Sequence, residues 1–262
     1  MKLSKLNASL HTQALAILQK ERLTFEDKEF VLANYQESAN HLIAPAGAFF
    51  TSAELAWEFS VVAVGFLSEK RKFRVLDLCA GIGALAHACL LRNPDIELVC
   101  VDINADYVDV GKKIVPQAQW HCMDALDLDQ LKALGHFDIV ISNPPFGAVT
   151  TGSGKKSPRY TGSEFAYKAI DIAAEIADVG YFILPQKLVP FNISASPRNE
   201  PFVHRDAYVK FLKQTRWELE IALTIDTAST ETPNFKNTRL TVEFAECKFS
   251  EIIAGTAESN AA

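Results

Sequence analysis

Residues 73–104 read FRVLDLCAGIGALAHACLLRNPDIELVCVDIN, and this stretch decides the fold. A short apolar run, Phe73–Leu78, leads into a glycine-containing turn and then into a helical pattern at Ala84–Leu91. A second apolar run, Glu97–Val101, follows a turn that contains asparagine and proline. A strand, a helix and a second strand in this order form a βαβ unit with parallel strands, so the stretch predicts an α/β fold.

The alternation of strands and helices continues beyond this unit. Further strands are predicted at Gln119–Cys122, Asp138–Ser142 and Tyr181–Leu184, and further helices at Ala105–Ile114, Leu126–Leu134 and Glu164–Ala177. Two β-rich runs follow near the C-terminus, Trp217–Ile225 and Arg239–Phe249. The segment between these runs has no room for a helix, so we expect them to pair antiparallel. The predicted sheet is therefore mostly parallel and closed by an antiparallel C-terminal hairpin.

The N-terminal part of the chain has a different pattern. Apolar residues recur at helical spacing over residues 4–21 and 25–40, which predicts a small helical region. Thr51 or Ser52 is suited to cap the next helix, which is expected to run to about Leu67. The predicted organisation has three parts: a helical N-terminal region at 1–46, the α/β domain at 47–250 and a flexible tail at 251–262.

The composition is typical of a globular protein with a sizeable core: 262 residues, 48% of them hydrophobic, and a mean hydropathy of +0.05. The longest apolar stretches, such as Val61–Leu67, are too short to cross a membrane, and the N-terminus lacks the apolar run of a secretory signal. The five cysteines include no CxxC pair, which indicates reduced thiols in a cytoplasmic protein, and no spacing predicts a metal site. The net charge of −6 argues against a strongly basic nucleic-acid binder but allows a local basic patch.

A second informative stretch, ISNPPFG at residues 141–147, follows the predicted strand Asp138–Ser142. Proline fixes its own φ and restricts the residue before it, so the turn is stiff and suited to holding acceptor groups still. An exocyclic amine on a planar ring such as adenine is a poor nucleophile, because its lone pair is delocalised into the ring. The Asn143 side chain and the Pro144 carbonyl would stabilise positive charge on that amine as it attacks an electrophile. Phe146 is placed to stack on the ring.

Three acidic residues stand at the ends of the first three predicted strands. Asp77 precedes the glycine turn, Asp102 lies 25 positions later (102 − 77), and Asp124 follows the third strand. Two interpretations are open, because Gly81–Ala86 also fits the G-x-G-x-x-A pattern of dinucleotide binding with Asp102 as the ribose acid. Asp77 at the strand end would repel a pyrophosphate, so a cationic ligand is favoured.

These motifs, in this order, resemble the S-adenosylmethionine-dependent N6-adenine methyltransferases that carry Asn-Pro-Pro-Phe, over about residues 47–250. The resemblance implies a Rossmann-like methyltransferase fold with S-adenosylmethionine as cofactor. The implied catalytic residues are Asn143, Pro144, Pro145 and Phe146. The implied cofactor contacts are Phe49, Phe50, Thr51, Asp77, Cys79, Ala80, Gly81, Gly83, Asp102, Ile103, Asp124, Ala125 and Asn143. Cys79 stands where many relatives have glycine, and it is expected to pack beneath the ligand rather than act as a nucleophile.

Two further segments carry the resemblance. Residues 47–51 are similar to the phenylalanine-containing segment that covers the methionine end of the cofactor in N6-adenine DNA methyltransferases, including Type I modification subunits; Ser52 stands where proline is usual. Residues 232–238 are similar to the closing hairpin of small ribosomal-RNA adenine methyltransferases. The resemblance therefore leaves both DNA and RNA open as the substrate.

The same catalytic motif serves adenine in DNA, adenine in RNA and glutamine in release factors. The glutamine enzymes usually carry tyrosine where Phe146 stands, so a base is favoured. We therefore predict an adenine-specific DNA methyltransferase of the restriction-modification kind, with RNA adenine and then glutamine as alternatives. A catalytically silent subunit is a further alternative, but it would have no reason to keep the acceptors.

The loop at 148–162 follows the catalytic turn and contains Lys155, Lys156 and Arg159. We predict that these side chains bind the substrate through its phosphates, with an ordinary solvated loop as the alternative. A second basic stretch, residues 198–216, is better explained as the polar face of a helix. No separate target-recognition domain is visible, which predicts relaxed recognition or a specificity-conferring partner, either another protein or a second copy of the chain.

Overall fold

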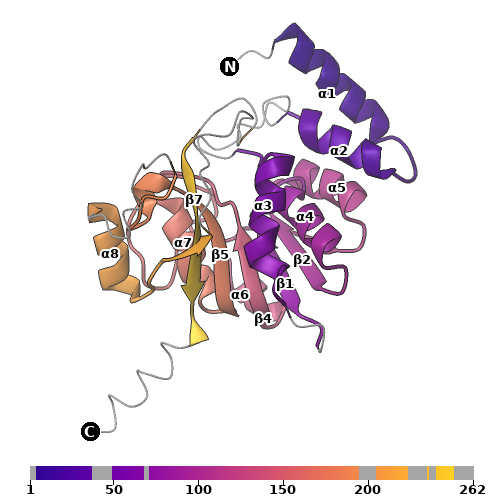
Figure 1. Cartoon of the computed structure of the whole chain (residues 1–262). Coiled ribbons are helices and arrows are strands. Elements are labelled where there is room, and N and C mark those ends of the chain that lie inside the picture. Colours follow the sequence, from indigo (N-terminus) through magenta and orange to yellow (C-terminus); the bar gives the residue numbers. More distant parts are fainter. Residues whose placement is uncertain are drawn as a thin grey trace, which may run out of the picture.

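The computed structural model describes residues 4–36, 49–67, 71–194, 205–223, 235 and 240–250, which form a three-layer α/β sandwich (Figure 1). Its central sheet has seven strands in the order β3-β2-β1-β4-β5-β7-β6. The strands are β1 (Arg74–Leu78), β2 (Glu97–Asp102), β3 (Gln119–Cys122), β4 (Phe137–Ser142), β5 (Ala177–Pro185), β6 (Glu220–Leu223) and β7 (Val242–Lys248). The first five are parallel, and β7 runs antiparallel to β5 and β6. The predicted parallel sheet with its antiparallel closing hairpin is confirmed.

Helices cover both faces of this sheet (Figure 1). One face carries α3 (Ala53–Val64), α4 (Ala84–Arg92) and α5 (Ala105–Ile114), and the other carries α6 (Leu128–Ala133), α7 (Phe165–Ala173) and α8 (Asp206–Thr215). On the first face, Phe59 of α3 packs edge-to-face on Phe244 of β7, with ring centroids 5.2 Å apart. On the second, Tyr167 of α7 stacks on Phe211 of α8 at 4.4 Å. The sheet is thus buried on both sides, as a parallel sheet requires.

The two N-terminal helices, α1 (Lys5–Ile17) and α2 (Phe25–Asn34), lie outside α4 and α5 (Figure 1). Glu29 of α2 lies 3.2 Å from the His87 ring on α4, and the Lys113 ammonium on α5 donates to the Lys20 carbonyl at 3.0 Å. The predicted helical N-terminal region is therefore a pair of helices attached to one helical layer.

The structure contains the predicted helix cap at Ser52 and a helix in the C-terminal basic stretch, but it starts β5 earlier than predicted. Ser52 caps α3, since its hydroxyl accepts a hydrogen bond from the Leu55 backbone N–H at 3.2 Å. Strand β5 begins at Ala177, where a helix was expected to end, and Gly180 lets it pack closely: a Cβ there would lie 2.4 Å from the Phe182 ring. The basic stretch near the C-terminus does contain a helix, α8, with Tyr208 and Phe211 buried and the lysines exposed.

Several predictions fall on residues outside the described part of the chain. These are the domain limits near residues 46 and 251, the first residues of the 47–51 segment, and most of the 232–238 segment. None of the described helices is long and apolar enough to span a membrane. All five cysteines are unpaired, and only Cys122 is exposed.

Candidate active site

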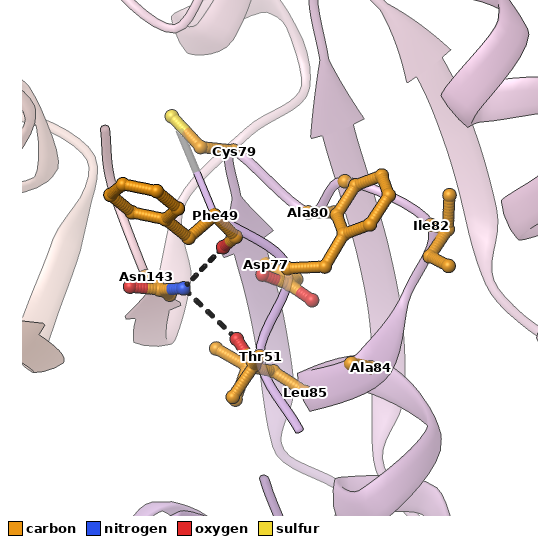
Figure 2. A pocket seen from close by; sticks show the side chains of 11 residues that line it. Phe49, Thr51, Asp77, Cys79, Ala80, Ile82, Ala84, Leu85 and Asn143 are labelled. Atoms are coloured by element: carbon orange, nitrogen blue, oxygen red, sulfur yellow. Dashed lines mark hydrogen bonds between the residues drawn. The ribbon is translucent and has the colours of Figure 1, made fainter. Parts of the chain in front are cut away.

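A narrow pocket lies where β1 and β4 end beside the segment that leads into α3 (Figure 2). Eight of the thirteen predicted cofactor residues line it: Phe49, Phe50, Thr51, Asp77, Cys79, Ala80, Gly81 and Asn143. The parallel order of β1 and β4 places their carboxyl ends together, so residues more than 60 positions apart meet at one edge of the sheet. The fold therefore brings the predicted cofactor turn and the predicted catalytic turn to the same pocket.

The glycine turn after β1 has a conformation that depends on glycine. Gly81 and Gly83 have φ values of 55° and 90°, in the left-handed region that residues with a Cβ rarely adopt. A Cβ on Gly81 would also lie 3.3 Å from the Phe50 ring, which covers the turn. Asp102 at the end of β2 holds the turn, because its carboxylate accepts hydrogen bonds from the backbone N–H groups of Gly81 at 2.7 Å and Asn104 at 2.9 Å.

Asp77 lies at the floor of the pocket with its carboxyl group buried (Figure 2). One carboxyl oxygen accepts a hydrogen bond from the Ala86 backbone N–H at 3.2 Å, and the other, Oδ1, has no partner in the described part of the chain. Burial raises the pKa of Asp77 to about 8, the Ala86 N–H opposes this shift, and the neighbouring Asp102 charge adds to it. An unpaired buried carboxyl group in a pocket is suited to receive a cationic group of a ligand.

Cys79 occupies the turn with a φ of 65°, so a residue with a Cβ adopts the left-handed conformation. Its side chain lines the pocket. Burial raises the pKa of the Cys79 thiol well above its ordinary value, and the nearby Asp102 and Asp77 charges act in the same direction. The group is therefore a neutral thiol, which is a poor nucleophile.

We expect Cys79→Gly to leave the free energy of unfolding within about 1 kcal/mol of wild type, because relief of left-handed strain offsets the lost thiol contacts. Cys79→Val should lower it by roughly 2 kcal/mol, since a β-branched residue is strained most at positive φ. Urea denaturation measures both changes. Cys89→Gly, at a buried helical position of α4, is the matched control and should be clearly destabilising. Equal losses at the two positions would contradict the strain argument.

Asn143 at the end of β4 is held by two hydrogen bonds from its amide nitrogen (Figure 2). Nδ2 donates to the Phe49 carbonyl oxygen and to the Thr51 hydroxyl oxygen, both at 3.0 Å. Its carbonyl oxygen, Oδ1, is buried and has no partner in the described residues. An amide in this orientation presents a fixed, unused acceptor at the edge of the pocket.

An aromatic cluster lies beside this amide. Phe146 is nearly buried and contacts the Phe49 ring at 6.2 Å and the Phe235 ring at 5.8 Å between centroids, the latter edge-to-face. Phe235 reaches the site because its backbone forms an antiparallel bridge with Thr51. Pro144 is buried and Pro145 is half-buried, so the turn is packed on both sides. A planar substrate group entering next to Asn143 would therefore meet aromatic surface.

The other five predicted cofactor residues do not line the pocket; they are Gly83, Asp102, Ile103, Asp124 and Ala125. The Asp124 carboxylate accepts hydrogen bonds from the Leu126 backbone N–H at 2.9 Å and from the Ser153 hydroxyl. Ile103 is 47% exposed at the end of β2, while Ala125 is buried. Their role in holding a ligand stays a prediction.

The basic loop after the catalytic turn is tied to nearby carboxylates. Lys155 forms an ion pair with Asp127 at 3.2 Å. Arg159 forms ion pairs with the buried Asp171 at 3.0 Å and with Glu175 at 2.6 Å, both outside the loop. Lys156 is exposed and has no ion pair among the described residues. Arg159 thus anchors the end of the loop, and of the predicted phosphate contacts only Lys156 is left without an internal carboxylate.

Residue-by-residue prediction missed four residues of this site. Ile82, Ala84 and Leu85 line the pocket, and Phe235 completes the aromatic cluster. Ile82 and Ala84 flank a predicted glycine, so their position next to the turn was a usable signal. Leu85 had none, because an apolar residue in the first turn of a helix is indistinguishable from core. In the described residues, no group of acidic, histidine and cysteine side chains has the geometry of a metal site.

Residues 50–157 match the family model of the methyltransferase small domain. Part of the chain is 39% identical over 102 residues to ribosomal RNA small subunit methyltransferase C of Shewanella loihica, covering 32% of this chain and 29% of that protein. Another match, 33% identical over 75 residues, is release factor glutamine methyltransferase of Escherichia coli, covering 28% of this chain and 27% of that protein. The matched segments thus span less than a third of these relatives' lengths.

A solved structure from Listeria monocytogenes, described as a class I S-adenosylmethionine-dependent methyltransferase, has the same fold. Its TM-score is 0.55 with 15% identity, covering 94% of this chain and 81% of that one. The match to the methyltransferase small domain agrees with the predicted cofactor, S-adenosylmethionine. The pocket fits such a group, because the unpaired Asp77 oxygen can receive a cation and the Gly81 turn lets a ligand approach the backbone.

Proposed function

We propose that this protein is an S-adenosylmethionine-dependent methyltransferase that modifies an exocyclic amine of a base in nucleic acid, with RNA as the first candidate. One observation carries the proposal: Asn143 lines the cofactor pocket and is held by its amide nitrogen, and its buried carbonyl oxygen has no partner in the described residues. The Pro144-Pro145-Phe146 turn that follows adds a second acceptor and an aromatic ring.

The chemistry divides between the cofactor and the chain. S-adenosylmethionine supplies an activated methyl group on a sulfonium centre. Asn143 Oδ1 and the Pro144 carbonyl accept hydrogen bonds from the target amine and stabilise the positive charge that develops on its nitrogen. Phe146, supported by Phe49 and Phe235, stacks on the ring and fixes its orientation. A base in a duplex must leave the stack to reach these groups.

The choice of polymer is supported by different observations. Ribosomal RNA is favoured because the curated relative from Shewanella loihica is named as an enzyme of that substrate. N6 of adenine in DNA, which the sequence analysis favoured, remains the second nucleic-acid candidate. Lys156 is the contact we propose for a phosphate, since Lys155 and Arg159 would have to leave Asp127 and Asp171 to take that role. A protein partner or a second copy of the chain would supply any further specificity.

The candidate substrate outside nucleic acids is the side-chain amide of glutamine in a protein. The relative named release factor glutamine methyltransferase favours it, and a glutamine amide offers the same pair of N–H hydrogens to Asn143. Phe146 counts against it, because the glutamine enzymes usually have tyrosine at that position.

The test uses the full chain with methyl-labelled S-adenosylmethionine and four acceptors: ribosomal RNA, intact small ribosomal subunits, unmethylated DNA and release factor. The acceptors come from host cells that lack this protein. Digestion to nucleosides and amino acids then identifies the methylated group. We expect label on an exocyclic nitrogen of an RNA base. Label in DNA or in glutamine would replace RNA by that acceptor, and absence of label in all four, with cofactor binding intact, would contradict the proposal.

A further inference from the structure

Thr51 is placed between the cofactor pocket and the catalytic amide (Figure 2). Its side chain lines the pocket and is 6% exposed. Its backbone is fixed on both sides: it bridges to Phe235, and the next residue, Ser52, caps α3 through the Leu55 N–H. The Thr51 hydroxyl is therefore attached to a rigid part of the fold.

The two groups that face Asn143 determine which way its amide points. The Phe49 carbonyl oxygen can only accept a hydrogen bond, so the amide nitrogen must face it. The Thr51 hydroxyl oxygen lies at the same distance, 3.0 Å, and accepts from the same nitrogen. A primary amide has two N–H hydrogens, and these two acceptors match that number. Oδ1 is then directed away from both acceptors and has no partner in the described residues.

We propose that Thr51 is a positioning residue, which holds the Asn143 amide so that Oδ1, and not the amide nitrogen, faces the substrate amine. This role rests on the proposed function. A reversed amide would point N–H hydrogens at the N–H hydrogens of the target and remove the acceptor.

The expected effect follows from the loss of one hydrogen bond. Thr51→Val keeps the shape of the side chain and removes the acceptor, and one neutral hydrogen bond changes such an orientational equilibrium by roughly five- to tenfold. We expect kcat to fall by about that factor, while KM for the acceptor and the affinity for S-adenosylmethionine change by less than about twofold. Thr51→Ser keeps the hydroxyl, so its kcat should stay close to that of the wild type.

The test has a kinetic arm and a spectroscopic arm. In 15N-labelled protein, the side-chain amide signals of Asn143 are assigned by their loss in Asn143→Ala. One of the two hydrogen signals should move in Thr51→Val and stay in place in Thr51→Ser. Thr215→Val is the matched control, because Thr215 is a buried threonine whose hydroxyl donates to the Phe211 carbonyl in α8, remote from the pocket. It should leave both the Asn143 signals and kcat unchanged.

Failure of the proposed function and failure of the positioning role give different results. If the wild-type protein methylates none of the acceptors, the proposed function fails, and the amide signals still decide whether Thr51 orients Asn143. Unchanged Asn143 signals in Thr51→Val would overturn the positioning role. A loss of cofactor affinity as large as the loss of kcat, without recovery in Thr51→Ser, would also overturn the positioning role. Such a result is expected of a residue that only lines the cofactor pocket.

Discussion

Replacing Asn143 by alanine is expected to lower the rate of methyl transfer by about a hundredfold or more. The substitution removes the only side-chain acceptor that the Asn-Pro-Pro-Phe turn offers the target amine. Removal of one preorganised polar group from an active site typically costs a factor of roughly 10² to 10³ in turnover. The Pro144 carbonyl remains, so we expect residual activity rather than none. Single-turnover transfer of labelled methyl measures the effect without a contribution from product release.

Two measurements separate this loss from a structural defect. The affinity of Asn143→Ala for S-adenosylmethionine should change by much less than turnover, because most of the pocket wall comes from other residues. Asn34→Ala is the matched control: the Asn34 amide nitrogen also donates to a backbone carbonyl, that of Phe30, but lies in α2 away from the pocket. Its turnover should equal that of the wild type. Turnover in Asn143→Ala close to the wild-type rate would rule out the proposed mechanism.

The fold could be predicted because its signals are local. Several strands of the parallel sheet are apolar runs with a polar residue at or near the carboxyl end, as Asp77 is in β1 and Asn143 is after β4. The prediction was weaker at the start of β5, where Ala177, Asp178 and Gly180 have no preference for a strand. There the neighbouring strands determine that the segment is a strand, because β5 pairs with β4 on one side and with β7 on the other. Gly180 makes room for Phe182. Long-range pairing of this kind is invisible in a local pattern.

In the candidate site, too, some features could be predicted from local sequence and others depend on long-range contacts. The pocket is lined by residues that were predicted from their position in the sequence, such as Asp77 near a strand end and Gly81 in a tight turn. The sequence did not show which partner a charged side chain would take. Asp124 turns to the Leu126 N–H and Ser153, and Arg159 pairs with Asp171 of α7. Such partners depend on how loops fold back on the helices, so residue type at a strand end predicts a site better than it predicts a contact.

Asp77 supplies the second large effect, on cofactor binding and its pH dependence. Burial raises the pKa of this carboxyl group to about 8, so without cofactor it is mostly protonated at neutral pH. A cationic group near the unpaired Oδ1 favours the charged form, so binding of S-adenosylmethionine should release a proton. Below pH 8 the ligand competes with that proton, and the affinity should fall by roughly tenfold for each pH unit between 7.5 and 5.5.

Calorimetry of S-adenosylmethionine binding at pH 7, in two buffers with different ionisation enthalpies, measures the proton release. Asp77→Asn should release no proton, bind at least tenfold more weakly at pH 8, and lose the pH dependence. Asp109→Asn on the exposed side of α5 is the control and should behave as wild type. A wild-type affinity that stays constant from pH 5.5 to 7.5 would show that the Asp77 carboxyl is already charged before the cofactor binds.

The same pKa shift predicts that Asp77 lowers the stability of the protein when no cofactor is bound. In the unfolded chain the Asp77 pKa is about 4, whereas the folded state raises it to about 8. As pH rises from 4 to 8, the unfolded state loses its proton while the folded state keeps it, so the Asp77 contribution to unfolding free energy falls through this window and levels off above pH 8. Asp77→Asn removes this cost.

We therefore expect the variant to unfold at a higher temperature than wild type at pH 7.5 without cofactor, with a smaller difference at pH 5. Saturating S-adenosylmethionine should reverse the order at pH 7.5, because only the wild type gains the charge pair. A variant less stable than wild type at pH 7.5 without cofactor would contradict the assignment of Asp77 as a residue kept for binding at the expense of stability.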